Sequence, residues 1–188
     1  EGILGVAQEK NYHVLLCVFG EHRDALLRTV QELMAQSVDG MILAAEGDYL
    51  PTMRLLQKAN FPFVCIGGRP VPECGNSCYI NYRESAAKMA QYLIERGTQT
   101  VHIVTAPQHS DCRDALEEGF GAAWQEGGHP TELLRLESIE PSFRGGEQYI
   151  RLLAQSRQPL PNAILCQSDE TAAGIIKAAG ELGIAVPE

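Results

Sequence analysis

Residues 38–68 read VDGMILAAEGDYLPTMRLLQKANFPFVCIGG, and this stretch decides the fold. It contains two apolar runs, 41–45 and 63–66, of the continuous kind found in strands that are covered on both faces. Apolar residues at helical spacing between the runs predict a helix over 52–59. A strand, a helix and a second strand in this order predict parallel strands joined by a crossover helix.

The same alternation extends to both sides of this stretch. We expect further helices over residues 1–12, 23–36, 83–95, 114–125, 146–154 and 170–182, and further strands over 14–19, 78–80, 101–105, 133–137 and 163–166. Such alternation predicts an α/β protein with parallel sheets flanked by helices. A break at 97–99 divides the chain into two similar Rossmann-like lobes, 1–98 and 99–188, and ligands of such folds bind at the carboxyl ends of the strands.

Composition excludes two classes of partner. The chain has 15 Lys and Arg against 24 Asp and Glu, a formal net charge of -9. Proteins that track the phosphates of nucleic acids need clustered basic residues, so these 188 residues are not expected to bind DNA themselves. The apolar runs are far shorter than the roughly 20 residues of a membrane helix, so no membrane partner is expected.

The cysteines favour a reducing cytoplasm. Cys17, Cys65 and Cys166 lie inside apolar runs, where a reduced thiol packs as a small hydrophobic group. Cys74 and Cys78 flank a Gly-Asn-Ser turn, but no His or second Cys pair at ligand spacing accompanies them. The turn is therefore interpreted as a surface loop, and no metal is expected.

Sequence signatures of catalysis are absent. The chain has no G-x-G-x-x-G, G-x-x-x-x-G-K-[ST], G-x-S-x-G or H-E-x-x-H motif. No His is predicted beside the candidate acidic residues Asp48, Glu84, Asp111 or Asp169. We therefore expect a binding protein that is not an enzyme and needs no cofactor.

Several segments, taken in order, resemble the effector-binding core of LacI/GalR-family transcriptional regulators. They are Glu1-Gly2-Ile3 with Asn11-Tyr12, the segments 38–43, 61–70, 86–97 and 119–124, and then 162–174 and 182–187. The resemblance covers essentially the whole chain. It implies a periplasmic-binding-protein-like type I fold with an effector crevice between the lobes, truncated at both ends.

The resemblance also implies a function. Members of that family carry a helix-turn-helix segment, absent from this chain, that binds operator DNA, and they usually form homodimers in the cytoplasm. We expect a repressor that senses a sugar or sugar derivative by reorientation of its lobes, although some relatives bind nucleobases. Periplasmic sugar-binding proteins of ABC transporters share the core and remain the alternative. The loop Ile66 to Pro70 resembles the regulators' version and favours the first interpretation.

The first candidate effector ligands follow the strand that ends at Ile80. The family usually has Asp where Asn81 stands, so Asn81 either contacts the effector or only caps the next helix. Glu84 falls where some sugar-binding members place an acidic ligand, and it is equally suited to the first turn of a helix.

The second candidates lie in the loop after strand 101–105. Family members commonly place an effector-binding Arg here; counting back from Gly119, Asp114 occupies that position and Arg113 lies one residue away. An Arg offers a rigid fork of donors that suits hydroxyl, carboxylate or phosphate groups, so Arg113 is retained together with Asp111 and Asp114. A solvated Arg at the start of a helix is the alternative.

The remaining candidates lie near other strand ends. Ser168-Asp169 stands where the family more often has Asn-Asp, with Asn reaching the effector, and both residues also suit a helix cap. The resemblance assigns a stacking ring to Phe143. The segments 20–22, which includes His22, and 46–48 are expected to line the crevice from the first lobe, and the alternative for each is a loop without a binding role.

Overall fold

The computed structural model describes residues 2–18, 23–36, 38–44, 50–67, 76–107, 111–156 and 158–187, without the side chains of residues 23, 24 and 111. Contacts among these residues divide the chain into two compact units; the main division falls between Cys78 and Tyr79, and Gly67 also groups with the second unit. Both units are α/β, as the sequence predicts.

The first unit contains a parallel sheet in the order β1-β2-β3. Its elements are α1 (Gly2–Glu9), α2 (Arg23–Ala35), β1 (Met41–Ala44), α3 (Leu50–Lys58), β2 (Phe63–Ile66) and β3 (Ser77–Cys78). β1 and β2 pair over their whole length, from Met41 opposite Phe63 to Ala44 opposite Ile66. The strand, helix and strand predicted for residues 38–68 are therefore confirmed.

The core of the first unit forms between its sheet and two helices. Leu26 and Val30 of α2 are buried with Leu56 of α3 and with the inward side chains of β1, Met41 and Leu43. Alternate residues of β1 are buried and exposed, so only one face of this strand is covered, and the expectation that both faces are covered is wrong for β1.

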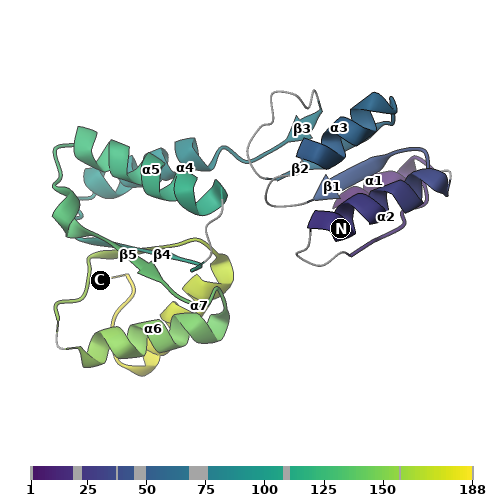
Figure 1. Ribbon diagram of the computed structural model, residues 1–188. Coiled ribbons are helices and arrows are strands. Elements are labelled where there is room, and N and C mark those ends of the chain that lie inside the picture. The colour runs from purple at the N-terminus through teal and green to yellow at the C-terminus, as the bar shows by residue number, and fades with distance from the viewer. Residues whose placement is uncertain are drawn as a thin grey trace. The chain divides into compact units, whose positions relative to one another are not determined.

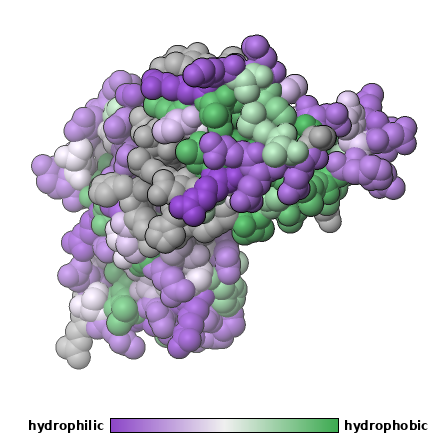
Figure 2. Space-filling model, turned by 45° about the vertical axis from the view of Figure 1, so that its right-hand side comes forward, coloured by the Kyte–Doolittle hydropathy of each residue, from purple (hydrophilic) through white to green (hydrophobic). Residues whose placement is uncertain are grey.

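One predicted strand is absent from the first unit. Residues 12–18 form no strand, and helix α1 ends at Glu9 with none of its residues buried. Leu16 and Val18 are 83% and 88% exposed. Figure 2 shows that hydrophobic residues reach the surface among hydrophilic ones on the face in view. An apolar run becomes a strand only when a neighbouring strand pairs with its backbone, and no described strand pairs with residues 12–18.

The second unit contains a parallel sheet in the order β5-β4-β6. Its elements are α4 (Tyr82–Glu95), β4 (Val101–Thr105), α5 (Asp111–Glu126), a 3₁₀ turn (Thr131–Leu133), β5 (Leu134–Ser138), α6 (Phe143–Gln155), β6 (Ala163–Cys166) and α7 (Asp169–Glu181). All five residues of the central strand β4 are buried.

The sheet of the second unit lies between two pairs of helices (Figure 1). Val101 and Ile103 of β4 pack in a core with α4 and α5, which includes Phe120 and Trp124. The alternate residue Val104 packs in a second core with α6 and α7. Side chains alternate across a strand, so β4 supplies both cores.

Helix α4 packs with the second unit. Ala86 and Ala90 of α4 are fully buried in the same core as Phe120. The helices approach closely because Gly119 has no side chain, and a Cβ there would overlap the backbone of Arg83. The grouping of contacts therefore divides the chain before α4, whereas the sequence suggests a break after it, near residue 97.

Several element boundaries differ from those predicted. Helix α6 begins at Phe143, ahead of the expected 146, because the Ser142 hydroxyl accepts a hydrogen bond from the Gly145 N–H at 3.0 Å and caps the helix. Helix α5 begins at 111 in place of 114, and β3 covers 77–78 in place of 78–80. Caps and turns decide these ends locally, while periodicity locates only the middle of an element.

Candidate functional site

The carboxyl ends of β4, β5 and β6 define the candidate site. The three strands are parallel, so these ends lie at one edge of the sheet. Helices α5, α6 and α7 each begin after one of these ends. The predicted residues 111–114, Phe143 and 168–169 stand at these helix starts, where ligands of open α/β sheets bind.

Arg113 is held by hydrogen bonds on two sides. Its Nε donates to Glu117 Oε1 at 2.7 Å, and its Nη1 donates to the carbonyl oxygens of Ala106 at 3.0 Å and Pro107 at 3.2 Å. The side chain is only 14% exposed. The planar fork of donors therefore fixes the segment that follows β4, a role that sequence reasoning did not assign to it.

Gln167 holds the same segment from the other side. It is the first residue after β6, and its backbone N–H donates to the Val104 carbonyl at 2.9 Å. Its side-chain Oε1 accepts a hydrogen bond from the Ala106 N–H, also at 2.9 Å. Ala106 is thus bound through its N–H by Gln167 and through its carbonyl by Arg113. The sequence signal for this residue was a polar side chain at the end of a buried strand.

Ser168 and Asp169 begin helix α7. The Ser168 hydroxyl accepts from the Thr171 N–H at 3.3 Å and donates to Thr171 Oγ1 at 2.9 Å. Ser168 is therefore the N-cap that the sequence allowed. Asp169 is exposed in the first turn, where the helix dipole favours a carboxylate.

Phe143 and the acidic residues of α5 complete this group of predicted residues. Phe143 is the first residue of α6 and is 37% exposed. Its carbonyl lies against Gly174 of α7. Asp114 is half-buried, and the side chain of Asp111 is outside the described part of the chain.

Asn81 and Glu84 form the start of α4. Asn81 is the N-cap: its Oδ1 accepts from the Glu84 N–H at 3.2 Å, and its Nδ2 donates to Glu84 Oε2 at 3.0 Å. Glu84 also lies 2.7 Å from Lys88 Nζ, and hydrogen bonding to Lys88 lowers the pKa of this exposed carboxyl. His22 and the segment 46–48 lie outside the described residues.

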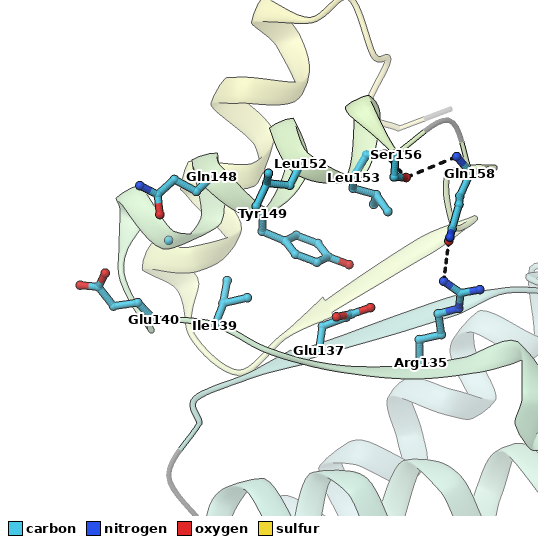
Figure 3. A pocket seen from close by; sticks show the side chains of 11 residues that line it. Arg135, Glu137, Ile139, Glu140, Gln148, Tyr149, Leu152, Leu153, Ser156 and Gln158 are labelled. Atoms are coloured by element: carbon cyan, nitrogen blue, oxygen red, sulfur yellow. Dashed lines mark hydrogen bonds between the residues drawn. The ribbon is translucent and has the colours of Figure 1, made fainter.

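A separate groove of about 540 Å³ lies between β5 and α6. Arg135, Glu137 and Ile139 line it from β5 and the residue after that strand, because alternate side chains share one face (Figure 3). Tyr149 and Leu153 line it from α6. None of the predicted site residues belongs to this groove.

Tyr149 links the groove to the buried strand β4. Its hydroxyl lies 2.6 Å from His102 Nδ1, a hydrogen-bond distance, and His102 is 5% exposed. Burial lowers the pKa of His102, an effect that nearby Glu137 opposes. Burial also raises the pKa of Tyr149 far above its ordinary value. Both side chains are therefore neutral near pH 7.

Other predicted features concern metals, cysteines and membranes. Within the described residues, no group of three or more His, Cys, Asp or Glu side chains is placed to hold a metal ion. Cys17, Cys65, Cys78, Cys112 and Cys166 form no disulfide there. Cys74 lies outside the described part. No described helix is both long enough and apolar enough to cross a membrane.

A family model described as "Periplasmic binding proteins and sugar binding domain of LacI family" matches residues 1–187. The chain belongs to this family. The resemblance noted in the sequence and the predicted two-lobed α/β fold are therefore confirmed.

Individual relatives of this LacI-family chain are regulators by name. Catabolite control protein A of Staphylococcus epidermidis is 27% identical over 190 residues, which cover 100% of the chain and 56% of that protein. HTH-type transcriptional repressor PurR of Actinobacillus pleuropneumoniae is 26% identical over 181 residues, covering 95% of the chain and 53% of that protein. The chain thus spans about half the length of these relatives.

A solved LacI-family structure shows the same fold. The LacI family transcriptional regulator of Enterococcus faecium, solved with bound ribose, matches 100% of the chain and 67% of its own with a TM-score of 0.81. The two sequences are 22% identical, so this likeness concerns the fold.

Proposed function

We propose that the chain is the effector-binding core of a cytoplasmic LacI-family transcription repressor. The observation that carries the proposal is the match of the family model to residues 1–187, together with the regulator relatives. The operator DNA is bound by a helix-turn-helix segment outside these residues, and the protein is a homodimer. A net charge of -9 supports DNA binding outside this core.

The effector is a sugar or sugar derivative. The family description names sugar binding, and the Enterococcus faecium regulator was solved with ribose. Sugars are recognised by a few convergent polar groups in a concave site, and the starts of α5 and α7 supply such groups beside the strand ends. The residues proposed to line the site are His22, Asn81, Glu84, Asp111, Arg113, Asp114, Phe143 and Asp169. Ser168 stands beside them as the cap of α7.

The protein acts as a switch without catalysis. An effector that binds one arrangement of the two lobes more tightly shifts the population toward it, by no more than its difference in affinity. That shift changes the affinity of the DNA-binding segments for the operator, and the coupling is reciprocal. No chemical step is needed.

A periplasmic sugar-binding protein is the second candidate. The family description covers both classes of protein, so the family match alone does not separate them. The described cysteines form no disulfide, which favours a protein of the cytoplasm. Specific binding of a DNA operator by the whole protein distinguishes the repressor from the transport protein.

A thermal-shift screen with sugars, sugar phosphates and nucleobases tests the effector class. A ligand that binds only the folded state raises Tm by mass action. Arg113→Ala removes the hydrogen bonds to Ala106 and Pro107 and should abolish the shift. Arg151→Ala is the matched control, because Arg151 pairs with Glu181 on an exposed surface. A protein that binds neither a screened compound nor DNA would refute the repressor assignment.

A further inference from the structure

The Gln167 side chain has a fixed orientation. A carboxamide has one acceptor oxygen and a nitrogen with two donor hydrogens. Because the Ala106 N–H is a donor, it requires the oxygen of Gln167 as its partner, and that contact is 2.9 Å long. The opposite assignment would place two donors against each other. The Nε2 group of Gln167 therefore points away from Ala106.

The Nε2 group of Gln167 has no acceptor among the residues that the structure describes, although the side chain is half-buried. Hydrogen bonds hold the backbone around the Gln167 side chain in place. Backbone pairing with Val104 anchors Gln167 itself, and Arg113 anchors the carbonyl of Ala106. An oriented donor pair with no partner among the described residues, at the carboxyl end of a parallel strand, is available to a ligand.

Unlike the Nε2 group of Gln167, the Ser168 hydroxyl already makes hydrogen bonds within the protein. Its hydroxyl has a single hydrogen, which it donates to Thr171 Oγ1, and its oxygen also accepts from the Thr171 N–H. The hydroxyl is thus occupied in capping α7. A ligand that accepted this hydrogen would have to replace the hydrogen bond to Thr171 Oγ1, which contributes about 1 kcal/mol.

We propose that Gln167, and not Ser168, supplies the side-chain hydrogen bond from the end of β6 to the effector. The Nε2 group donates to an oxygen of the effector, such as a sugar hydroxyl. This inference rests on the proposed function and adds a specificity-determining residue to its site. The proposal requires the effector to present an oxygen, as a hydrogen-bond acceptor, toward the end of β6.

Three substitutions separate the functions of the two residues. Gln167→Glu keeps an acceptor for the Ala106 N–H and removes the donors. Gln167→Met removes both the acceptor and the donors while keeping a side chain of similar volume. Ser168→Ala removes the α7 cap and leaves Gln167 unchanged.

The binding experiment is titration calorimetry on the whole protein with D-ribose, D-ribose 5-phosphate and adenine as probes. For a probe that binds the wild type, we expect Gln167→Glu and Gln167→Met each to weaken binding about tenfold, the effect of losing one good hydrogen bond. Ser168→Ala should lower Tm while leaving the affinity within about twofold, because a cap contributes to stability alone.

Hydrogen exchange at the Ala106 amide provides a readout without ligand. We expect protection to persist in Gln167→Glu and to be lost in Gln167→Met, because only the former retains an acceptor. Wild-type affinity in Gln167→Glu, or loss of binding in Ser168→Ala, overturns the inference while the proposed function stands. If the wild type binds none of the three probes, the proposed sugar effector fails and the inference fails with it.

Discussion

The crossing of α6 and α7 allows no side chain at Gly174. A Cβ at this position would lie 2.9 Å from the carbonyl carbon of Phe143 and 3.2 Å from the Glu147 nitrogen, with the Phe143 oxygen closer still. Carbon atoms pack at about 3.5–4.0 Å, so the carbonyl carbon alone would have to retreat by roughly 0.6–1.1 Å, and its closer oxygen by more. We therefore predict that Gly174→Ala destabilises the second unit.

The magnitude of this effect is the difference between two opposing contributions. Overpacking against backbone costs about 3 kcal/mol, the upper end of the usual range, because a backbone cannot change rotamer. Alanine recovers about 1 kcal/mol of helix propensity relative to glycine. The net loss is about 2 kcal/mol, or about 6 °C in Tm for a chain of this size.

Urea unfolding followed by the fluorescence of Trp124 measures this loss, because Trp124 is the chain's single tryptophan and is fully buried in the second unit. Gly180→Ala is the matched control: Gly180 lies in the same helix, and a Cβ there would meet nothing within 4 Å. We expect this control to be stabilised by up to about 1 kcal/mol. Equal stability of the two variants would refute the packing argument.

Two further predictions concern β4. The lowered pKa of His102 means that the unfolded state takes up a proton near 6.5 while the folded state does not. The contribution of His102 to stability is therefore fully present above pH 6.5 and falls below it by at most about 1.4 kcal/mol per pH unit. His102→Gln should remove this part of the pH dependence of the unfolding free energy. An unchanged pH profile in urea titrations would contradict the assignment. Asn162 Oδ1 accepts from the backbone N–H groups of Gln99 and Thr100 at 3.1 and 3.0 Å. Asn162→Ala should cost about 1 kcal/mol of unfolding free energy and Asn162→Asp much less, because the carboxylate keeps the acceptor; equal losses in denaturant titrations would show that the acceptor is unimportant.

The sequence predicted those parts of the fold that depend on local pattern. Residues 38–68 formed the expected strand, helix and strand because their periodicity and their flanking turns are properties of neighbouring residues. Residues 14–18 of the predicted strand 14–19 form no strand, because pairing depends on another segment, which periodicity does not report. The grouping of α4 also depends on distant contacts, such as Ala86 with Phe120.

The site was predicted in outline only. Ser168 and Asn81 cap their helices as their residue types allowed. The hydrogen bonds of Arg113 could not be foreseen, because two of its acceptors are backbone carbonyls, which any residue carries. Gln167 belongs to the candidate segment 167–169 but was given no role of its own, because the resemblance implies an effector-binding Asn at the next position.

Two side-chain amides join β4 to β6, one at each end of the strand pair. At the amino ends, the oxygen of Asn162 accepts from Thr100, and at the carboxyl ends the oxygen of Gln167 accepts from Ala106. Asn162 is exposed and its nitrogen is open to solvent, whereas Gln167 is half-buried beside the start of α7. Binding sites of parallel sheets form at the carboxyl ends. The side-chain amide of Asn162 therefore supports only the fold, whereas that of Gln167 supports the fold and also orients a donor toward a ligand.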